Sequence, residues 1–154
     1  MKAVREMVEA ELDTFVQLRH DIHQHPELAF AENRTSDLVA GMLEQWGYQV
    51  ERGIGGTGLV AQLRVGDGSK SVGIRADMDA LPILEESGVT HSSKHEGKMH
   101  ACGHDGHTTM LLAAAKVLAS RKAFNGTLNL IFQPAEEYGK SGSGAMQMIA
   151  DGLF

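Results

Sequence analysis

The sequence has 154 residues, which is enough for one domain with a buried core. Its net charge of −6, its lack of a basic cluster and its aromatic content of 5% argue against a nucleic-acid partner. It has no apolar run as long as a membrane span, and its acidic N-terminal region is atypical of a signal peptide, so we expect no membrane partner and a cytoplasmic location.

The spacing of apolar residues predicts an α/β fold. In chain order, the predicted elements are helices 4–24 and 33–46, strands 48–52, 59–65 and 72–76, a polar irregular segment 85–101, helix 108–120, strand 128–132 and helix 143–150. The turn residues 66–69 predict that the strands on either side of them pair as an antiparallel hairpin. Together these elements predict a layered mixed β-sheet flanked by helices.

Three polar segments lie where a predicted strand ends or a predicted helix begins. Asp77 and Asp79 follow one apolar strand, MHACGHDGH (99–107) precedes a helix, and QPAEE (133–137) follows another apolar strand. Ligands of open α/β sheets bind beyond the carboxyl ends of the strands. We therefore expect these three segments to meet at one site.

The segment 99–107 contains the only cysteine, Cys102, and His104 two residues later. A thiolate and an imidazole are ligands that zinc and similar divalent ions accept, and the polar neighbours argue against a cysteine that is merely buried. His100 and His107 are weaker candidates, because solvated or capping roles suit them equally well. Asp105 is a candidate N-cap or a partner to an imidazole.

Carboxylates supply the other candidate groups. If Glu136 and Glu137 are extended, their side chains point in opposite directions, so one can bind a metal while the other faces a water molecule. A metal ion acidifies water, and a nearby carboxylate can accept the released proton. Asp77 and Asp79 would share one side of a strand, where either could bind metal, hold a ligand imidazole or pair with Arg75.

A second group of histidines lies near the end of the first predicted helix. His20, His23 and His25 resemble a metal cluster, but Asp21 and Gln24 lie among them. We expect these histidines to order a loop rather than to bind metal.

Four motifs resemble the amidohydrolase family that contains N-acyl-amino-acid hydrolases, hippurate hydrolase and the auxin-conjugate hydrolases, a branch of the aminoacylase and carboxypeptidase group of dinuclear metallohydrolases. The motifs are RHDIHQHPELAFAE (19–32), GIRADMDALPI (73–83), MHACGHDGHT (99–108) and FQPAEE with GAMQMIADGLF (132–137 and 144–154). The resemblance implies that Cys102, His104 and Glu137 bind metal and that Glu136 is the general base. It implies that Asp79 supports a metal ligand or the catalytic water, and that Asp77 stands where other branches carry a ligand histidine.

The resemblance implies hydrolysis of the amide bond of a small-molecule N-acyl amino acid, with manganese or zinc as cofactor and two ions in the whole protein. Members of the family are considerably longer, so residues 1–154 are expected to be the N-terminal part of an incomplete catalytic domain, without the dimerisation domain and the C-terminal part. The ligand histidines that the family carries further along would then be absent, and we expect weak or no turnover.

Three alternatives remain open. The chain could be a metal-binding remnant without catalysis, or a cysteine hydrolase with Cys102 as nucleophile. The second alternative leaves the paired glutamates without a role. A homo-oligomer formed through an exposed sheet edge is also open.

Overall fold

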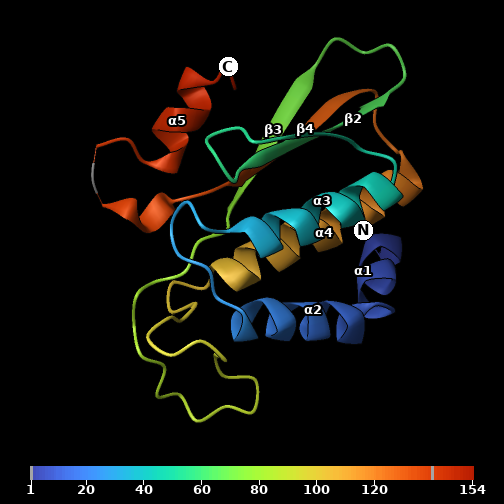
Figure 1. Ribbon diagram of the computed structural model, residues 1–154. Coiled ribbons are helices and arrows are strands. Elements are labelled where there is room, and N and C mark those ends of the chain that lie inside the picture. Colours follow the sequence, from blue (N-terminus) through green and yellow to red (C-terminus); the bar gives the residue numbers. More distant parts are fainter. Residues whose placement is uncertain (1, 140) are drawn as a thin grey trace.

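The computed structural model describes residues 2–139 and 141–154 (Figure 1). Its elements are α1 (Lys2–Glu9), α2 (Leu12–Gln24), α3 (Asn33–Gln45), β1 (Gln49–Arg52), β2 (Leu59–Val65), β3 (Ser71–Asp77), α4 (His104–Arg121), β4 (Gly126–Gln133), the 3₁₀ turn η1 (Glu136–Tyr138) and α5 (Gly144–Ala150). Within these residues, no helix is long and apolar enough to cross a membrane.

The four strands form one mixed sheet in the order β1-β2-β4-β3. β1 pairs with β2 and β2 pairs with β4 in antiparallel fashion, whereas β3 pairs with β4 in parallel. Helix α4 connects the two parallel strands, as the crossover of a parallel pair requires. The predicted mixed sheet flanked by helices is therefore confirmed.

The predicted hairpin of β2 and β3 is wrong, because β4 lies between these two strands. Residues 66–69 do turn the chain, but β2 pairs with β4 from Leu59 opposite Phe132 to Val65 opposite Gly126. β4 is buried or half-buried along its whole length, as a central strand should be, while β3 is exposed over its first five residues. Burial of the apolar β4 outweighs the local preference for a hairpin.

Two helix boundaries also differ from the prediction. Helix 4–24 is interrupted after Glu9, where Glu11 turns towards α4 and its carboxylate lies 2.5 Å from the Nζ atom of Lys116. In Figure 1, α1 therefore lies across the axis of α2. Helix α4 begins at His104 rather than Thr108, so part of the predicted Cys/His loop is the first turn of a helix.

The core lies between the sheet and α3 and α4, and α2 packs on the outer side of α4 (Figure 1). Leu59, Leu112, Leu130 and Phe132 are fully buried in this core. Removing such side chains from water is the main favourable term in folding. Helix α4 is thus held on two sides, which fixes the position of its N-terminal residues.

Candidate metal centre

The parallel pairing of β3 and β4 brings the three polar segments together. Residues that follow β3 and β4 leave the sheet at the same edge, and the first turn of α4 lies beside them. Gly103, which precedes α4, has a φ of +85°, a conformation that costs glycine little. The chain can therefore turn sharply between Cys102 and His104.

The sulfur of Cys102, a ring nitrogen of His104 and a carboxylate oxygen of Glu137 all lie within 4.8 Å of one another. Cys102 is exposed, His104 is buried and Glu137 is half-buried. One thiol, one imidazole and one carboxylate are ligands of zinc and similar ions, and three protein ligands are enough for a site with an open position. The donor set therefore fits a divalent ion that remains accessible from solvent.

Asp79 contacts both of the less exposed members of this trio. The Nδ1 atom of His104 lies 2.8 Å from the backbone oxygen of Asp79 and 3.2 Å from its Oδ1 atom. The backbone N–H of Glu137 donates a hydrogen bond of 2.9 Å to Oδ2 of the same carboxylate. If Nδ1 carries the proton donated to Asp79, Nε2 keeps the lone pair that binds metal. Asp79 thus orients one ligand and positions the backbone of another.

Asp79 and His104 each stabilise the charged form of the other. Burial alone would raise the pKa of the Asp79 carboxyl, but hydrogen bonds from His104 and from the backbone of Glu137 and Glu136 lower it. Burial alone would lower the pKa of His104, but its hydrogen bonds to Asp79 raise it. The metal-free site therefore favours a charged carboxylate beside a protonated imidazole, and a metal ion must displace that proton.

The thiol form of Cys102 predominates over the thiolate in the metal-free protein. Its hydrogen bond to Glu137, followed by desolvation and the charges of Glu137, Glu136 and Asp77, raises its pKa to about 11. A thiol with this pKa is a poor nucleophile near neutral pH. This environment argues against the cysteine-hydrolase alternative and leaves a cation as the species that would deprotonate Cys102.

The sequence suggested that Glu136 and Glu137 are extended. In the structure they lie in the 3₁₀ turn η1 instead. Ala135 before them has a φ of +49°, which is unusual for a residue with a β-carbon. Glu136 still faces the site, because its Oε2 atom lies 3.9 Å from Nε2 of His104, and its side chain is 39% exposed. A tight turn therefore separates the two carboxylates, rather than the alternation of a strand.

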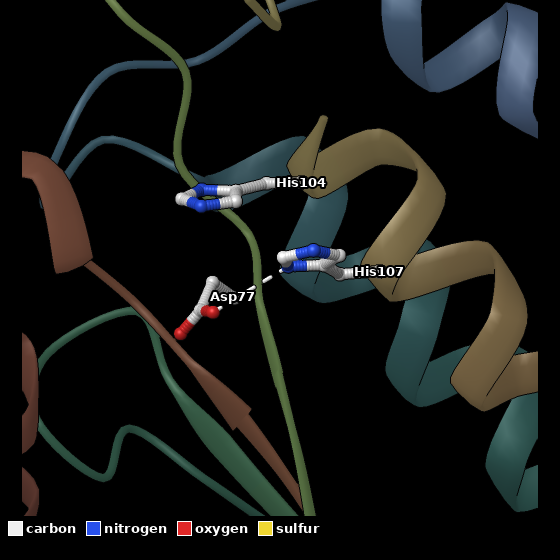
Figure 2. A group of neighbouring side chains, drawn as sticks. All are labelled: Asp77, His104 and His107. Atoms are coloured by element: carbon white, nitrogen blue, oxygen red, sulfur yellow. Dashed lines mark ion pairs between the residues drawn. The ribbon is translucent and has the colours of Figure 1, made fainter. Parts of the chain in front are cut away.

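A second group of possible ligands shares His104 (Figure 2). Ligand atoms of Asp77, His104 and His107 also lie within 4.8 Å of one another, and Nδ1 of His107 is 3.5 Å from Oδ2 of Asp77. Asp77 already pairs with the Arg75 guanidinium, whose NH2 atom lies 3.1 Å from Oδ1 and 3.2 Å from Oδ2. A cation at this group would have to compete with Arg75. Among the described residues, no arginine or lysine forms an ion pair with the trio that contains Cys102, so we take that trio as the candidate centre.

The other candidates from the sequence have different surroundings. His100 is buried without a hydrogen-bond partner for either ring nitrogen in the described part of the chain, and burial lowers its pKa to about 4. Asp105 is not the N-cap of α4, since that position belongs to Gly103. Instead Asp105 accepts hydrogen bonds from His23 and Arg19 of α2.

Sequence reasoning gave no role to Glu32. This glutamate is fully buried; its Oε1 atom accepts a 2.8 Å hydrogen bond from the N–H of Ala135, and its Oε2 atom accepts a 2.5 Å bond from the hydroxyl of Thr57. Burial raises the pKa of its carboxyl. Glu32 therefore holds the residue before Glu136 in its unusual conformation. The only sequence signal was its place at the end of the motif in residues 19–32.

Residues 73–154 match the family model described as peptidase family M20/M25/M40. The chain belongs to this family. The chain is 56% identical over 140 residues to a hippurate hydrolase of Campylobacter jejuni, an alignment that covers 91% of the chain and 36% of the relative. It is 48% identical over 144 residues to thermostable carboxypeptidase 2 of Saccharolobus solfataricus, with 92% and 36% covered.

Among solved structures, a dinuclear metal-binding peptidase of the M20 family from Bacillus subtilis superposes with a TM-score of 0.86 at 37% identity. This match covers 94% of the chain and 40% of that structure. The family resemblance that the motifs indicated is therefore confirmed, and M20 relatives are hydrolases that act on amide bonds. The chain spans little more than a third of the length of the curated relatives named above.

Proposed function

We propose that this protein hydrolyses the amide bond of N-acyl amino acids in the cytoplasm, with Cys102, His104 and Glu137 holding a manganese or zinc ion. One observation supports this above all: the three donors converge within 4.8 Å, and Asp79 contacts two of them. Residues 1–154 would be the N-terminal part of the catalytic domain. The whole protein would hold two ions, in keeping with the dinuclear metal binding of the Bacillus subtilis peptidase.

The names of two relatives support the substrate class. Hippurate is an acyl group joined to an amino acid. A carboxypeptidase releases the C-terminal amino acid, whose nitrogen is acylated by the preceding residue. Both reactions cleave an amide whose amine side carries a free carboxylate. The shared chemistry favours a small N-acyl amino acid over a long peptide or a nucleic acid.

Asp79 and Glu136 would have separate roles in the reaction. When bound, a divalent ion supplies Lewis acidity, which polarises the scissile carbonyl and acidifies water. Asp79 keeps the ring of His104 oriented and fixes the backbone of Glu137. Glu136 accepts the proton of the attacking water and then donates it to the amine nitrogen as the bond between carbonyl carbon and nitrogen breaks. The exposed position of Glu136 leaves room for a substrate beside it.

Metal binding and hydrolysis of hippurate test the proposal on the 154-residue chain. We expect zinc or manganese to bind with one ion per chain, and Cys102→Ser to abolish tight binding. Glycine release should be weak, and Glu136→Gln should remove it without changing the metal content. A chain that binds no divalent ion would refute the proposal, and hydrolysis that survives a chelator would refute the role of the metal.

The second candidate function, a metal-binding remnant without catalysis, rests on the same three converging donors, which can hold an ion whether or not a substrate is hydrolysed. It predicts the same metal content and the same loss in Cys102→Ser. It differs in predicting no glycine release above the level of Glu136→Gln at any metal concentration. Robust turnover by the 154-residue chain would contradict both this candidate and our expectation of weak activity.

A further inference from the structure

Six histidines outside the candidate centre lie on α2, directly after it or in the long segment 78–103. Three of them lie on or directly after α2 and three lie in the segment: His20, His23, His25, His91, His95 and His100. The rings of His20 and His91 are stacked with centroids 3.6 Å apart, and those of His25 and His95 meet at 5.9 Å. Apart from isolated bridges, this segment has no helix or strand, so its position depends on such contacts.

His23 is more deeply buried than His20 and His25, with 9% of its surface exposed. Its Nδ1 atom lies 3.0 Å from Oδ2 of Asp105, and its Nε2 atom lies 3.1 Å from Oε1 of Glu85. The side chains of Asp105 and Glu85 are 1% and 3% exposed. One imidazole thus joins two carboxylates that come from different segments of the chain and are largely shielded from water.

Both carboxylates are ionised. Burial alone would raise the pKa of the Glu85 carboxyl, but hydrogen bonds from Ser87, Ser93 and His23 lower it to about 2. Burial alone would raise the pKa of the Asp105 carboxyl, but the hydrogen bonds from His23 and the backbone of Gly106, together with nearby charges, lower it. An ionised carboxylate can only accept a hydrogen bond, and each of these two carboxylates lies beside a different ring nitrogen of His23. His23 therefore links the two carboxylates directly, one through each ring nitrogen.

The two ends of this link lead to the candidate centre. Glu85 also accepts a 2.6 Å hydrogen bond from the backbone N–H of Ser93 and so closes the first part of the segment that ends in Cys102. Asp105 lies in the first turn of α4 and directly follows His104. Release of His23 would free the segment before Cys102 at one end and leave a buried carboxylate beside His104 at the other.

We propose that His23 is a positioning residue for the metal centre: through Glu85 and Asp105 it holds Cys102 and His104 where they can share an ion. This inference rests on the proposed function for the presence of the ion, but not for the link itself. Residues that orient metal ligands through hydrogen bonds affect metal affinity by about 10- to 100-fold. His23 acts one residue further away, so we expect an effect of about 10-fold, at the lower end of that range.

The test compares His23→Ala with His20→Ala as a matched control. His20 is also a histidine of α2 and also contacts the segment, through the ring of His91, but no hydrogen bond joins it to Asp105 or Glu85 among the described contacts. The affinity for Co²⁺ is followed by the thiolate-to-cobalt absorption band, which reports Cys102 as a ligand. Circular dichroism of the metal-free proteins checks that each variant is folded.

We expect His23→Ala to weaken Co²⁺ binding about 10-fold with unchanged helix content, and His20→Ala to change it less than about 2-fold. Glu85→Ala should weaken binding as His23→Ala does, whereas Glu85→Gln keeps an oxygen that accepts from His23 and should retain most of the affinity. Equal binding by wild type and His23→Ala, or equal losses in His23→Ala and His20→Ala, would overturn the inference. If His23→Ala does not fold, the comparison of Glu85→Ala with Glu85→Gln decides in the same way.

Hydrogen exchange separates this inference from the proposed function. If the wild-type protein shows no thiolate–cobalt band, the proposed function fails, while the link can still be measured in the metal-free protein. Amides of residues 86–103 should then exchange faster in His23→Ala than in His20→Ala. Equal exchange in the two variants would overturn the link itself.

Discussion

Glu32 offers the sharpest test of how the fold positions the twin glutamates. Its carboxylate holds the N–H of Ala135, a residue that is fully buried and has a left-handed backbone. Glu32→Ala leaves that N–H without a partner, and an unsatisfied buried donor costs about 1–3 kcal/mol. The hydroxyl of Thr57 loses its partner too, but it is only half-buried and can turn to water.

The left-handed conformation of Ala135 is already present in the wild-type protein, where the hydrogen bond to Glu32 helps to hold it, so its strain adds nothing to the loss. The unsatisfied N–H predicts that Glu32→Ala lowers the free energy of unfolding by about 1–3 kcal/mol. Glu32→Gln is the matched control, because its oxygen can accept from Ala135 and its amide can donate to the rotated hydroxyl of Thr57. We expect Glu32→Gln to cost less than about 1 kcal/mol.

Urea denaturation of the metal-free proteins, followed by circular dichroism, measures both variants. The pH dependence gives a further check. Burial raises the pKa of Glu32 above its ordinary value of 4.5, so the folded state binds this proton more tightly than the unfolded state does. The stability that this group contributes is complete below pH 4.5 and is lost as pH rises through the folded pKa. The free energy of unfolding of Glu32→Gln should therefore rise relative to that of wild type as pH increases above 4.5.

Equal stabilities of Glu32→Ala and Glu32→Gln at pH 7 would refute the reasoning, because the two variants differ in the acceptor that Ala135 requires. A second measurement addresses the site itself. Release of Ala135 from its left-handed conformation should move Glu136 and Glu137, so Glu32→Ala should also bind zinc more weakly than Glu32→Gln does. Unchanged zinc affinity in a folded Glu32→Ala protein would mean that η1 is positioned by other contacts.

Three further predictions concern the candidate centre. Alkylation of metal-free Cys102 by iodoacetamide should be slow at pH 8 and rise towards pH 11, and Glu137→Gln should accelerate it at pH 8, because the carboxylate raises the thiol pKa to about 11. Asp79→Asn should weaken zinc binding about 10- to 100-fold in a calorimetric titration, because the buried carboxylate contacts two ligand residues. His107→Ala and Asp77→Asn should each change zinc affinity less than about 3-fold in the same titration. A larger loss would indicate that the ion binds to Asp77, His104 and His107 instead.

Much of the site could be predicted from sequence because its chemistry is local. Cys102 and His104 are two residues apart, and Glu137 follows an apolar strand whose carboxyl end had to face the same edge as that of β3. Periodicity also located most helices and strands to within a few residues. The role of Asp79 stayed open in the sequence, since a strand-end carboxylate can bind metal, orient an imidazole or pair with an arginine.

What the sequence could not provide were the contacts between distant residues. The strand order depends on whether β3 or β4 lies beside β2, and the local turn at 66–69 favours the wrong neighbour. Glu32 and Ala135 are 103 residues apart, and nothing in their local sequences predicts a hydrogen bond between them. The wrong strand neighbour arises because burial in the complete fold outweighs local preference.

The position of Asp79 explains how a site made from three segments can exist before a metal ion arrives. One buried carboxylate contacts the ring of His104 and the backbone of Glu137, so two ligands depend on a single side chain just beyond the end of β3. The same contacts favour protonated His104, and Glu137 favours protonated Cys102. Metal binding must therefore release protons, and its affinity should rise with pH. The metal-free site is thus positioned for an ion but keeps its protons until one binds.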